Sequence, residues 1–318
     1  MEQAEGGVTL SMTTPSGLET LHARRVLIAT GTRETPRSAR LLSGERPLGV
    51  INTGALQSYA YLEGGLPFRR PIIVGTELVA LSAILTCRGM GARPVAMIEE
   101  KNEVTARKPL FLYPRLLGIP VMTGTRIVDI AGNPRVTHVV LERDGRTERL
   151  HCDGVILTGR FTAENHLARL SGLEIDPLTG GPVIDDFGRS SMDGVFAAGN
   201  LLRPVETAGW CFREGRAIAR TLYRDLADGL PPRLDAARLH IGPGLRYAVP
   251  QRLSDGRDGL DRIQLRLERP FDGWLVARDG NGQVLARSRL RNRPERRILL
   301  PAAPLAAAGD IELTLEDK

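Results

Sequence analysis

The strongest constraint on the fold is a strand–turn–helix–strand pattern over residues 71–100. The apolar run Ile72–Val74 predicts a buried strand, Gly75-Thr76-Glu77 predicts a tight turn, and the apolar spacing of residues 78–88 predicts a helix. Residues 94–98 predict a second strand. Because a helical crossover returns the chain in the same direction, the two strands should run parallel in an α/β sheet.

The turn at Gly75 compares with the dinucleotide-binding fingerprint G-x-G-x-x-G/A. Gly75 allows the tight turn, and Ala80 is small enough for close packing of the helix on the strand. Glu77 stands where the backbone should approach a pyrophosphate, and at ~4 Å and an effective dielectric near 20 a like-charge contact costs about 4 kcal/mol before screening. Glu99, which follows the second strand, has the chemistry to bind an adenine ribose. These four residues predict a degenerate NAD(P) site, or a Rossmann-like unit that has lost its nucleotide.

Two strand-like segments lie on either side of this unit in the sequence. Val26–Ala29 is a short apolar run, typical of a strand buried on both faces, and it stops at Thr30-Gly31. Gly194–Asn200 (GVFAAGN) is an apolar run that ends in Gly199-Asn200 and precedes a helical pattern over residues 211–228. A polar side chain at such a strand end can hydrogen-bond a ribityl hydroxyl, and the next helix can direct its first N–H groups at a flavin edge. Each segment alone is also typical of an ordinary strand and loop.

In this order and at these separations, the segments resemble the two-dinucleotide-domain flavoproteins, the superfamily of pyridine nucleotide-disulfide oxidoreductases. In that superfamily a β-meander leads to an ATG strand, a nicotinamide-binding domain is inserted whole, and the chain returns to the FAD domain through a GVFAAGD strand. The matching pieces are Ala29-Thr30-Gly31, Ile72–Glu100, Gly154–Arg160 and Pro182–Asn200, within a resemblance that covers about residues 6–228. The turns Gly75-Thr76-Glu77 and Val205–Trp210 look closer to the flavoprotein subunits of amine, opine and hydrogen-cyanide-forming dehydrogenases.

The resemblance implies an α/β fold: a truncated FAD-binding Rossmann-like domain, an inserted NAD(P)-type Rossmann-like domain, and a small C-terminal all-β domain. The implied borders are residues 1–70 and 161–229 for the FAD-type domain, 71–160 for the inserted domain, and 230–318 for an antiparallel β domain after a proline-containing linker. The FAD-binding βαβ with which the family opens is missing from this sequence. We therefore expect a mis-called start, a split gene, or a partner chain that completes the FAD domain in a homo- or hetero-oligomer.

The resemblance also implies a cofactor site and an activity. FAD would be bound by Thr30, Gly31, Gly199 and Asn200, where Asn200 is a neutral replacement for the usual acid, and Trp210 would wall the flavin. The implied protein is an FAD-dependent oxidoreductase, or a subunit of one, that oxidises a small amine-like substrate and passes electrons to a partner or quinone. Its catalytic residues do not show in any motif.

Two alternatives stay open on the sequence. One is an NAD(P)H-dependent flavin reductase-type enzyme, against which Glu77 argues, and the other is a structural subunit or remnant that does not hold flavin. Disulfide reduction is not expected, because Cys87, Cys152 and Cys211 form no redox pair and the C-terminal domain lacks the His-Glu pair of disulfide reductases.

Composition and residue spacing exclude several classes of site and location. The net charge is +6, and only three of the 43 basic residues are lysine. The arginines are spread along the chain rather than clustered, so they do not predict a nucleic-acid-binding patch. No histidine or cysteine spacing predicts a metal site. The N-terminus has no signal-peptide pattern, and the apolar run 71–87 contains Glu77 and is shorter than the ~20 residues a bilayer requires. We expect a cytoplasmic protein without a membrane span.

Periodicity predicts further elements. In the helix after Gly75, the apolar positions should fall on one side, with Leu78, Leu81 and Leu85 at helical spacing and Ala80, Ala83 and Ile84 filling in. The other expected elements are a hairpin over 6–22, a helix over 53–61, strands at 121–122, 139–141 and 155–157, and C-terminal strands at 263–267, 274–277, 284–287, 298–300 and 311–315.

Overall fold

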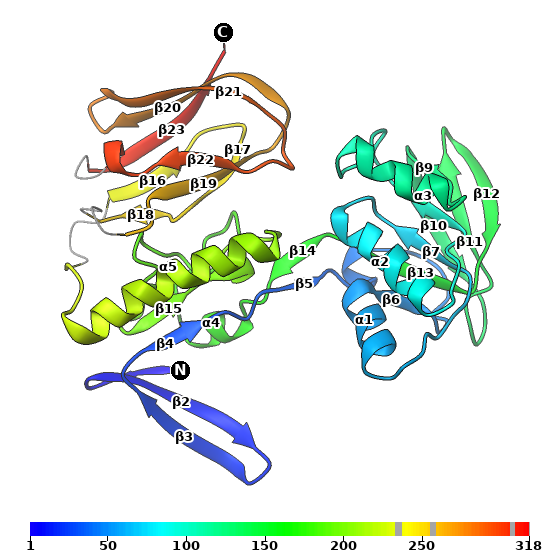
Figure 1. Ribbon diagram of the computed structural model, residues 1–318, viewed down its shortest axis with the longest axis horizontal. Coiled ribbons are helices and arrows are strands. Elements are labelled where there is room, and N and C mark those ends of the chain that lie inside the picture. The colour runs from blue at the N-terminus through cyan, green and yellow to red at the C-terminus, as the bar shows by residue number, and fades with distance from the viewer. Residues whose placement is uncertain (233–236, 255–258, 306–308, 318) are drawn as a thin grey trace. The chain divides into compact units, whose positions relative to one another are not determined.

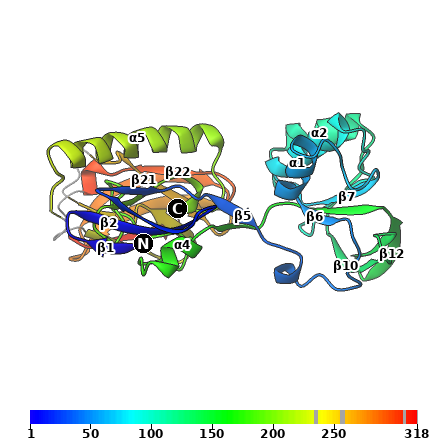
Figure 2. The same ribbon diagram turned by 90° about the horizontal axis from the view of Figure 1, so that it is seen from below.

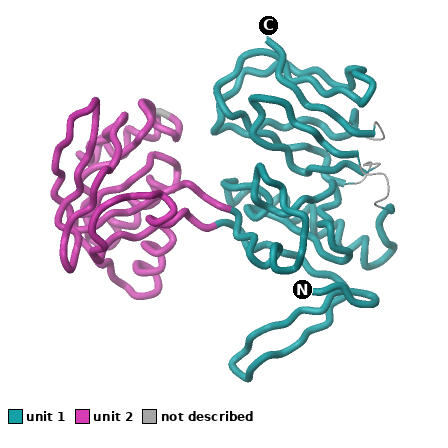
Figure 3. Tube along the Cα trace, turned by 180° about the vertical axis from the view of Figure 1, so that it is seen from behind, with its two compact units in different colours: residues 1–32, 163–318 teal, residues 33–162 magenta. Residues whose placement is uncertain are grey.

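The computed structural model describes residues 1–232, 237–254, 259–305 and 309–317, and these form two compact units. Residues 1–32 and 163–318 make the first unit, and residues 33–162 make the second (Figure 3). The chain passes between the units twice, through the paired strands β5 (Thr32–Glu34) and β14 (Phe161–Ala163). The domain borders that the resemblance implies at 70/71, 160/161 and 229/230 stay a prediction.

The second unit is built on a five-stranded parallel sheet (Figure 1). Its order is β6 (Val50–Asn52), β13 (Gly154–Leu157), β7 (Pro71–Val74), β8 (Ala96–Ile98) and β9 (Val121–Met122). The helices are α1 (Thr53–Tyr61), α2 (Leu78–Gly89) and α3 (Leu112–Leu116), and an antiparallel sheet is formed by β10 (Thr125–Ala131), β11 (His138–Arg143) and β12 (Arg146–His151).

Successive side chains of the central strands point to opposite faces of the sheet, and each face packs in its own apolar core. Ile73 packs with residues of α1 and α2, whereas its neighbour Ile72 packs with residues of the antiparallel sheet. Such strands are apolar on both faces because both faces of a parallel sheet are covered. The local sequence therefore predicts the βαβ unit correctly, and the bounds of β7 and α2 confirm it.

The buried side of α2 differs from the expectation in two positions. Leu78 and Leu85 are exposed, whereas Leu81, Ala80, Ala83 and Ile84 are buried as expected. The helix is apolar around most of its circumference, so periodicity alone does not select a side. Small alanine side chains allow the helix to approach the sheet closely, and they are buried together with Leu81 and Ile84.

The first unit begins with a meander of β1 (Glu2–Ala4), β2 (Gly7–Thr14) and β3 (Gly17–Ala23), which confirms the predicted hairpin. Strand β4 (Val26–Ile28) then pairs in parallel with β15 (Val195–Ala197), so Ile28 and Phe196 share a sheet as expected. The helices are α4 (His166–Leu170) and α5 (Ala208–Ala227), and α5 lies along one outer side of the unit (Figure 2).

The expectation that β4 is buried on both faces is wrong. Leu27 is 41% exposed. Its partner in the register is Phe196, whose buried side chain packs against Ile218 of α5. Helix α5 thus covers β15 on this face but leaves β4 open, and among the described residues β15 is the only strand paired with β4.

The C-terminal part is a sandwich of two sheets around one apolar core. The larger sheet contains β18 (Arg252–Leu253), β16 (Ala237–Ile241), β23 (Ile311–Glu316), β20 (Phe271–Asp279) and β21 (Val284–Asn292), and the smaller contains β17 (Leu245–Val249), β19 (Arg262–Leu267) and β22 (Ile298–Pro301). The predicted hairpin β20–β21 is present. One pair, β16–β23, runs parallel, so the sheet is mixed rather than antiparallel throughout.

Candidate cofactor sites

The predicted FAD residues lie at one edge of the β4–β15 pair. Thr30-Gly31 follow β4, and Gly199-Asn200 follow β15. Because the strands are parallel and Ile28 is opposite Ala197, both turns leave the sheet at its carboxyl end. In open α/β sheets this is the end at which ligands bind.

The turn after β4 is held to the returning chain. Thr30 Oγ1 donates to the carbonyl oxygen of Glu164 at 2.7 Å, and the Glu164 N–H donates to the carbonyl of Gly31 at 2.9 Å. Gly31 has a φ of 74°, and a Cβ added to it would meet nothing within 4 Å. Open space therefore adjoins this turn.

The turn after β15 satisfies its own polar groups. Asn200 Oδ1 accepts from the N–H of Glu206 at 2.7 Å, and Asn200 Nδ2 donates to the Glu206 carbonyl at 3.4 Å. The Gly199 N–H donates to Glu214 Oε2 at 2.8 Å. Asn200 thus closes the loop 200–206, and a ribityl hydroxyl would use the remaining bonding capacity of its amide.

Glu214 belongs to a buried network that the sequence reading missed. Its carboxylate forms an ion pair with Arg203 at 2.6 Å, with the two side chains 2% and 0% exposed. Gln264 of β19 accepts from Arg203 Nε at 3.0 Å and donates to Glu214 at 3.3 Å. The network joins the loop after β15 to α5 and the sandwich. The available signal was helical spacing, because Glu214 shares the buried face of α5 with Ile218 and Thr221.

Trp210, the predicted flavin wall, lies in the first turn of α5. The guanidinium of Arg297 is 3.8 Å from its ring centroid, and that of Arg213 is 5.1 Å away. Arg297 also pairs with Glu206, as does Arg266 at 2.9 Å. Burial alone would raise the pKa of Glu206, but the two arginines hold it below its usual value. The arginines occupy much of the Trp210 surface, so its contact with flavin stays a prediction.

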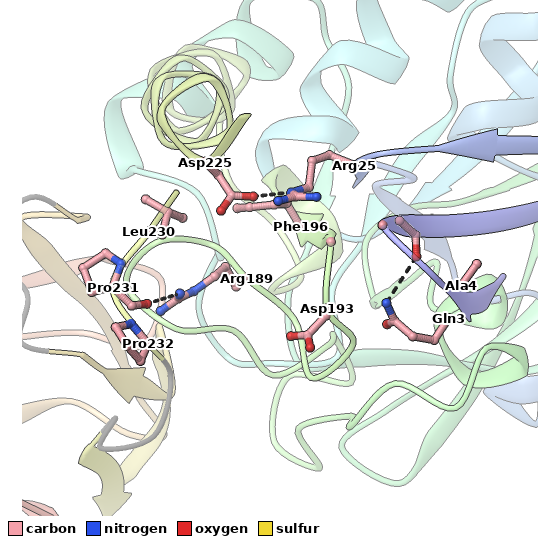
Figure 4. Close-up of a pocket in the computed structure, with 13 residues that line it drawn as sticks. Gln3, Ala4, Arg25, Arg189, Asp193, Phe196, Asp225, Leu230, Pro231 and Pro232 are labelled. Atoms are coloured by element: carbon pink, nitrogen blue, oxygen red, sulfur yellow. Dashed lines mark hydrogen bonds and ion pairs between the residues drawn. The ribbon is translucent and has the colours of Figure 1, made fainter. Parts of the chain in front are cut away.

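A cavity of about 610 Å³ lies at the opposite end of the same strands (Figure 4). Arg25, which precedes β4, pairs there with Asp225, and Arg189 donates to the Pro231 carbonyl at 2.6 Å. None of the predicted FAD residues lines this cavity. Because it adjoins the amino ends of the strands, we do not assign it to the cofactor.

The predicted NAD(P) residues cluster at the carboxyl edge of the five-stranded sheet. Gly75 has a φ of 123°, as a tight turn requires, and Ala80 is fully buried, as close helix packing requires. The Glu77 side chain folds back over this turn, where its Oε2 accepts from the Thr158 hydroxyl at 2.8 Å. Burial raises the pKa of Glu77, and the nearby charge of Glu99 adds to the effect.

Glu99 follows β8, and donors of its own chain bind its carboxylate. The hydroxyl of Thr76 donates to Oε2, that of Thr105 lies 3.3 Å from the same oxygen, and the Lys101 N–H is 3.1 Å from Oε1. The side chain is buried. The acceptor predicted for an adenine ribose is therefore already engaged by three donors of its own chain.

Parallel strand pairing, with turns at the carboxyl ends of the strands, gives both units a Rossmann-like α/β architecture. The sequence matches the family described as pyridine nucleotide-disulphide oxidoreductase over residues 1–215. The chain belongs to this family. The match ends inside α5, before the sandwich.

Curated relatives extend well beyond this chain. It is 30% identical over 207 residues to the chlorobenzene dioxygenase ferredoxin reductase component of Cupriavidus sp. (strain PS12), covering 62% of this chain and 46% of that protein. It is 27% identical over 238 residues to sarcosine oxidase subunit alpha of Rhizobium meliloti (strain 1021), covering 72% and 22%. The chain thus spans about half or less of the length of these relatives.

Solved structures share the fold. Thioredoxin reductase of T. acidophilum superposes with a TM-score of 0.56 at 21% identity, covering 71% of this chain and 72% of that one. An NAD-dependent persulfide reductase from A. fulgidus superposes with a TM-score of 0.56 at 15% identity, covering 85% and 50%. Within the described residues no helix is long and apolar enough to cross a membrane, and no cluster of His, Cys, Asp or Glu has metal-binding geometry.

Proposed function

We propose that this chain is part of an FAD-dependent oxidoreductase that oxidises a small amine-like substrate and passes the electrons to a partner or quinone. The supporting observation is the β4–β15 pairing, which brings Thr30-Gly31 and Gly199-Asn200 to one sheet edge. These four residues would hold the flavin and ribityl side of FAD. The cofactor, when bound, supplies the two-electron chemistry.

The residues fit only this side of the cofactor. Neither 1–32 nor 163–318 contains a G-x-G-x-x-G turn that leads into a helix, so the diphosphate would have no glycine-rich turn to bind. The exposed Leu27 marks where a further strand and helix beside β4 would complete the layer. We propose that a βαβ segment outside these 318 residues completes the site in the assembled protein.

The amine-like substrate is supported by the similarity to a sarcosine oxidase subunit. The competing function, an NAD(P)H-dependent reductase, is supported by similarity to reductase components of dioxygenase systems. The crowded Glu77 turn weighs against the second function. A subunit that holds no flavin is the remaining alternative.

The assembled protein, purified with whatever polypeptide accompanies it, tests the proposal. We expect flavin absorbance that bleaches anaerobically with sarcosine or a related secondary amine and not with NADH. Thr30→Val should lower the FAD content, because it removes the hydroxyl at the site, whereas Thr20→Val on the exposed strand β3 is the matched control. A colourless assembly would contradict flavin binding, and bleaching by NADH alone would favour the reductase.

A further inference from the structure

The second unit has a glycine-lined recess at the carboxyl edge of its sheet. We call it the Gly75–Gly159 cradle, formed by the turns that follow β7 and β13. Both glycines have positive φ, 123° and 64°. A Cβ on Gly75 would collide with Thr158 Oγ1 and lie 2.5 Å from Glu77 Oε2, and one on Gly159 would collide with Glu77 Oε1.

This geometry explains what the glycines make room for. In a dinucleotide-binding turn, glycine lets the backbone approach a pyrophosphate. Here the space beside both glycines contains the carboxyl group of Glu77, which at Gly75 shares it with the Thr158 hydroxyl. Glu77 is the N-cap residue of α2, but its side chain makes no cap hydrogen bond, so its oxygens are directed into the cradle instead.

The carboxyl group is held there by Thr158. Its Oγ1 is 2.8 Å from Glu77 Oε2 and 2.8 Å from the Val74 carbonyl oxygen. A hydroxyl has one hydrogen and cannot donate to both acceptors. When it bonds the carbonyl, a protonated Glu77 completes the second bond, and the raised pKa of this buried group agrees with that state.

Neighbouring groups close the rest of the edge. Arg40 donates to the carbonyl oxygens of Thr158 at 3.0 Å and Gly159 at 2.8 Å, which fixes the turn after β13. Thr76 Oγ1 accepts from the N–H of Thr105 at 2.9 Å, and the Thr76 carbonyl accepts from Ala106 at 3.0 Å. Residues 101–106 are thus attached to the turn and to Glu99.

We infer that Glu77 is a built-in occupant of the phosphate position, which fills the Gly75–Gly159 cradle and excludes pyridine dinucleotides from residues 33–162. NAD(P)H is then not the electron donor, although the unit keeps the architecture of a nicotinamide-binding domain. The inference concerns binding to this unit alone, so it stands or falls independently of flavin content and amine oxidation.

Titration calorimetry of the full chain with NADH, and with ADP as a diphosphate probe, tests this inference. We expect no binding to wild type up to about 1 mM, and saturable binding at least about tenfold tighter for Glu77→Gly. Glu77→Gln keeps the volume of the side chain without its charge, so we expect no binding of NADH or ADP to this variant. Glu77→Ser vacates the cradle and supplies a side chain that favours the N-cap position, so it replaces Glu77→Gly if that variant unfolds.

Three results would overturn the inference: micromolar NADH binding by wild type, no gain in either vacated variant once circular dichroism shows it folded, or equal gain in Glu77→Gln. The last would mean that charge rather than filling excludes the ligand. Flavin absorbance and amine-dependent bleaching, measured on the same samples, report the proposed function separately.

Discussion

The two predicted sites at strand ends have the same topology, but one borders open space and the other is occupied by a side chain of the same chain. Beside β4 and β15, a Cβ added to Gly31 or to Gly199 would meet no atom within 4 Å. Beside β7 and β13, Gly75 and Gly159 border the carboxyl group of Glu77. The difference teaches that a Rossmann-like edge does not by itself define a cofactor site, because one side chain of the same chain can take the ligand's place.

The largest expected effect concerns the support of the open site. Arg203→Met removes one partner of the buried Arg203–Glu214 pair and leaves an uncompensated charge. We expect the free energy of unfolding to fall by about 3–5 kcal/mol in urea denaturation. FAD content should fall with it, because Glu214 also binds the Gly199 N–H.

Arg126→Met is the matched control. Arg126 pairs with Glu142 at 2.8 Å on the surface, where such pairs contribute about 0–1 kcal/mol. If both variants lost the same stability, the Arg203 network would be no more than a surface contact. The Arg203–Glu214 pair would then not distinguish the turn after β15 from an ordinary surface loop.

The next prediction compares the two edges directly. Gly159→Ala and Gly31→Ala both place a Cβ at positive φ, 64° and 74°, which costs roughly 1–2 kcal/mol in each case. Only Gly159→Ala also displaces the Glu77 carboxyl group. We expect it to cost roughly 1 kcal/mol more than the roughly 1–2 kcal/mol of Gly31→Ala, by thermal or urea unfolding.

A double variant makes that comparison sharper. In the Glu77→Gly background the added methyl group of Gly159→Ala enters vacated space, and its cost should fall toward that of Gly31→Ala. Strict additivity of Glu77→Gly and Gly159→Ala would show that the two positions do not interact. That result would contradict the inference that Glu77 fills the Gly75–Gly159 cradle.

Local patterns predicted much of this architecture. The β2–β3 hairpin and the strand–turn–helix at β7 and α2 arise from periodicity and turn residues, and α1 begins and ends where expected. Sequence reading also named Glu77 as a residue that would obstruct the turn, and this role stays a prediction. It did not place Gly159 beside that carboxyl group, because the contact joins strands distant in sequence.

Other features depended on tertiary context that no local pattern holds. Leu27 reads as buried, but it is exposed because α5 covers only the neighbouring strand. The spacing of α5 can place Glu214 on a buried face, but its partners Arg203 and Gln264 come from a loop and from β19. The parallel pairing of β16 with β23 joins segments at opposite ends of the sandwich sequence. The roles of the predicted FAD and NAD(P) residues stay predictions.

The smallest expected effect is a pH dependence that only the filled edge should show. Burial raises the pKa of Glu77 in the folded chain above its ordinary value of 4.5. For such a group the stability contribution is complete below the unfolded pKa and is lost as pH rises through the folded pKa. Wild type should therefore lose stability over that range, whereas Glu77→Gln, which stays neutral, should lose less.

Melting temperatures of wild type and Glu77→Gln across pH 4–8 measure this effect, and the difference should be smaller than that of Gly159→Ala. Glu142→Gln serves as the exposed control, since its partner Arg126 is at the surface. Parallel pH profiles for wild type and Glu77→Gln would show that Glu77 stays ionised at no cost in the cradle. Its carboxylate would then have to be solvated, and a recess that admits water to that depth would no longer be filled by the protein's own side chain.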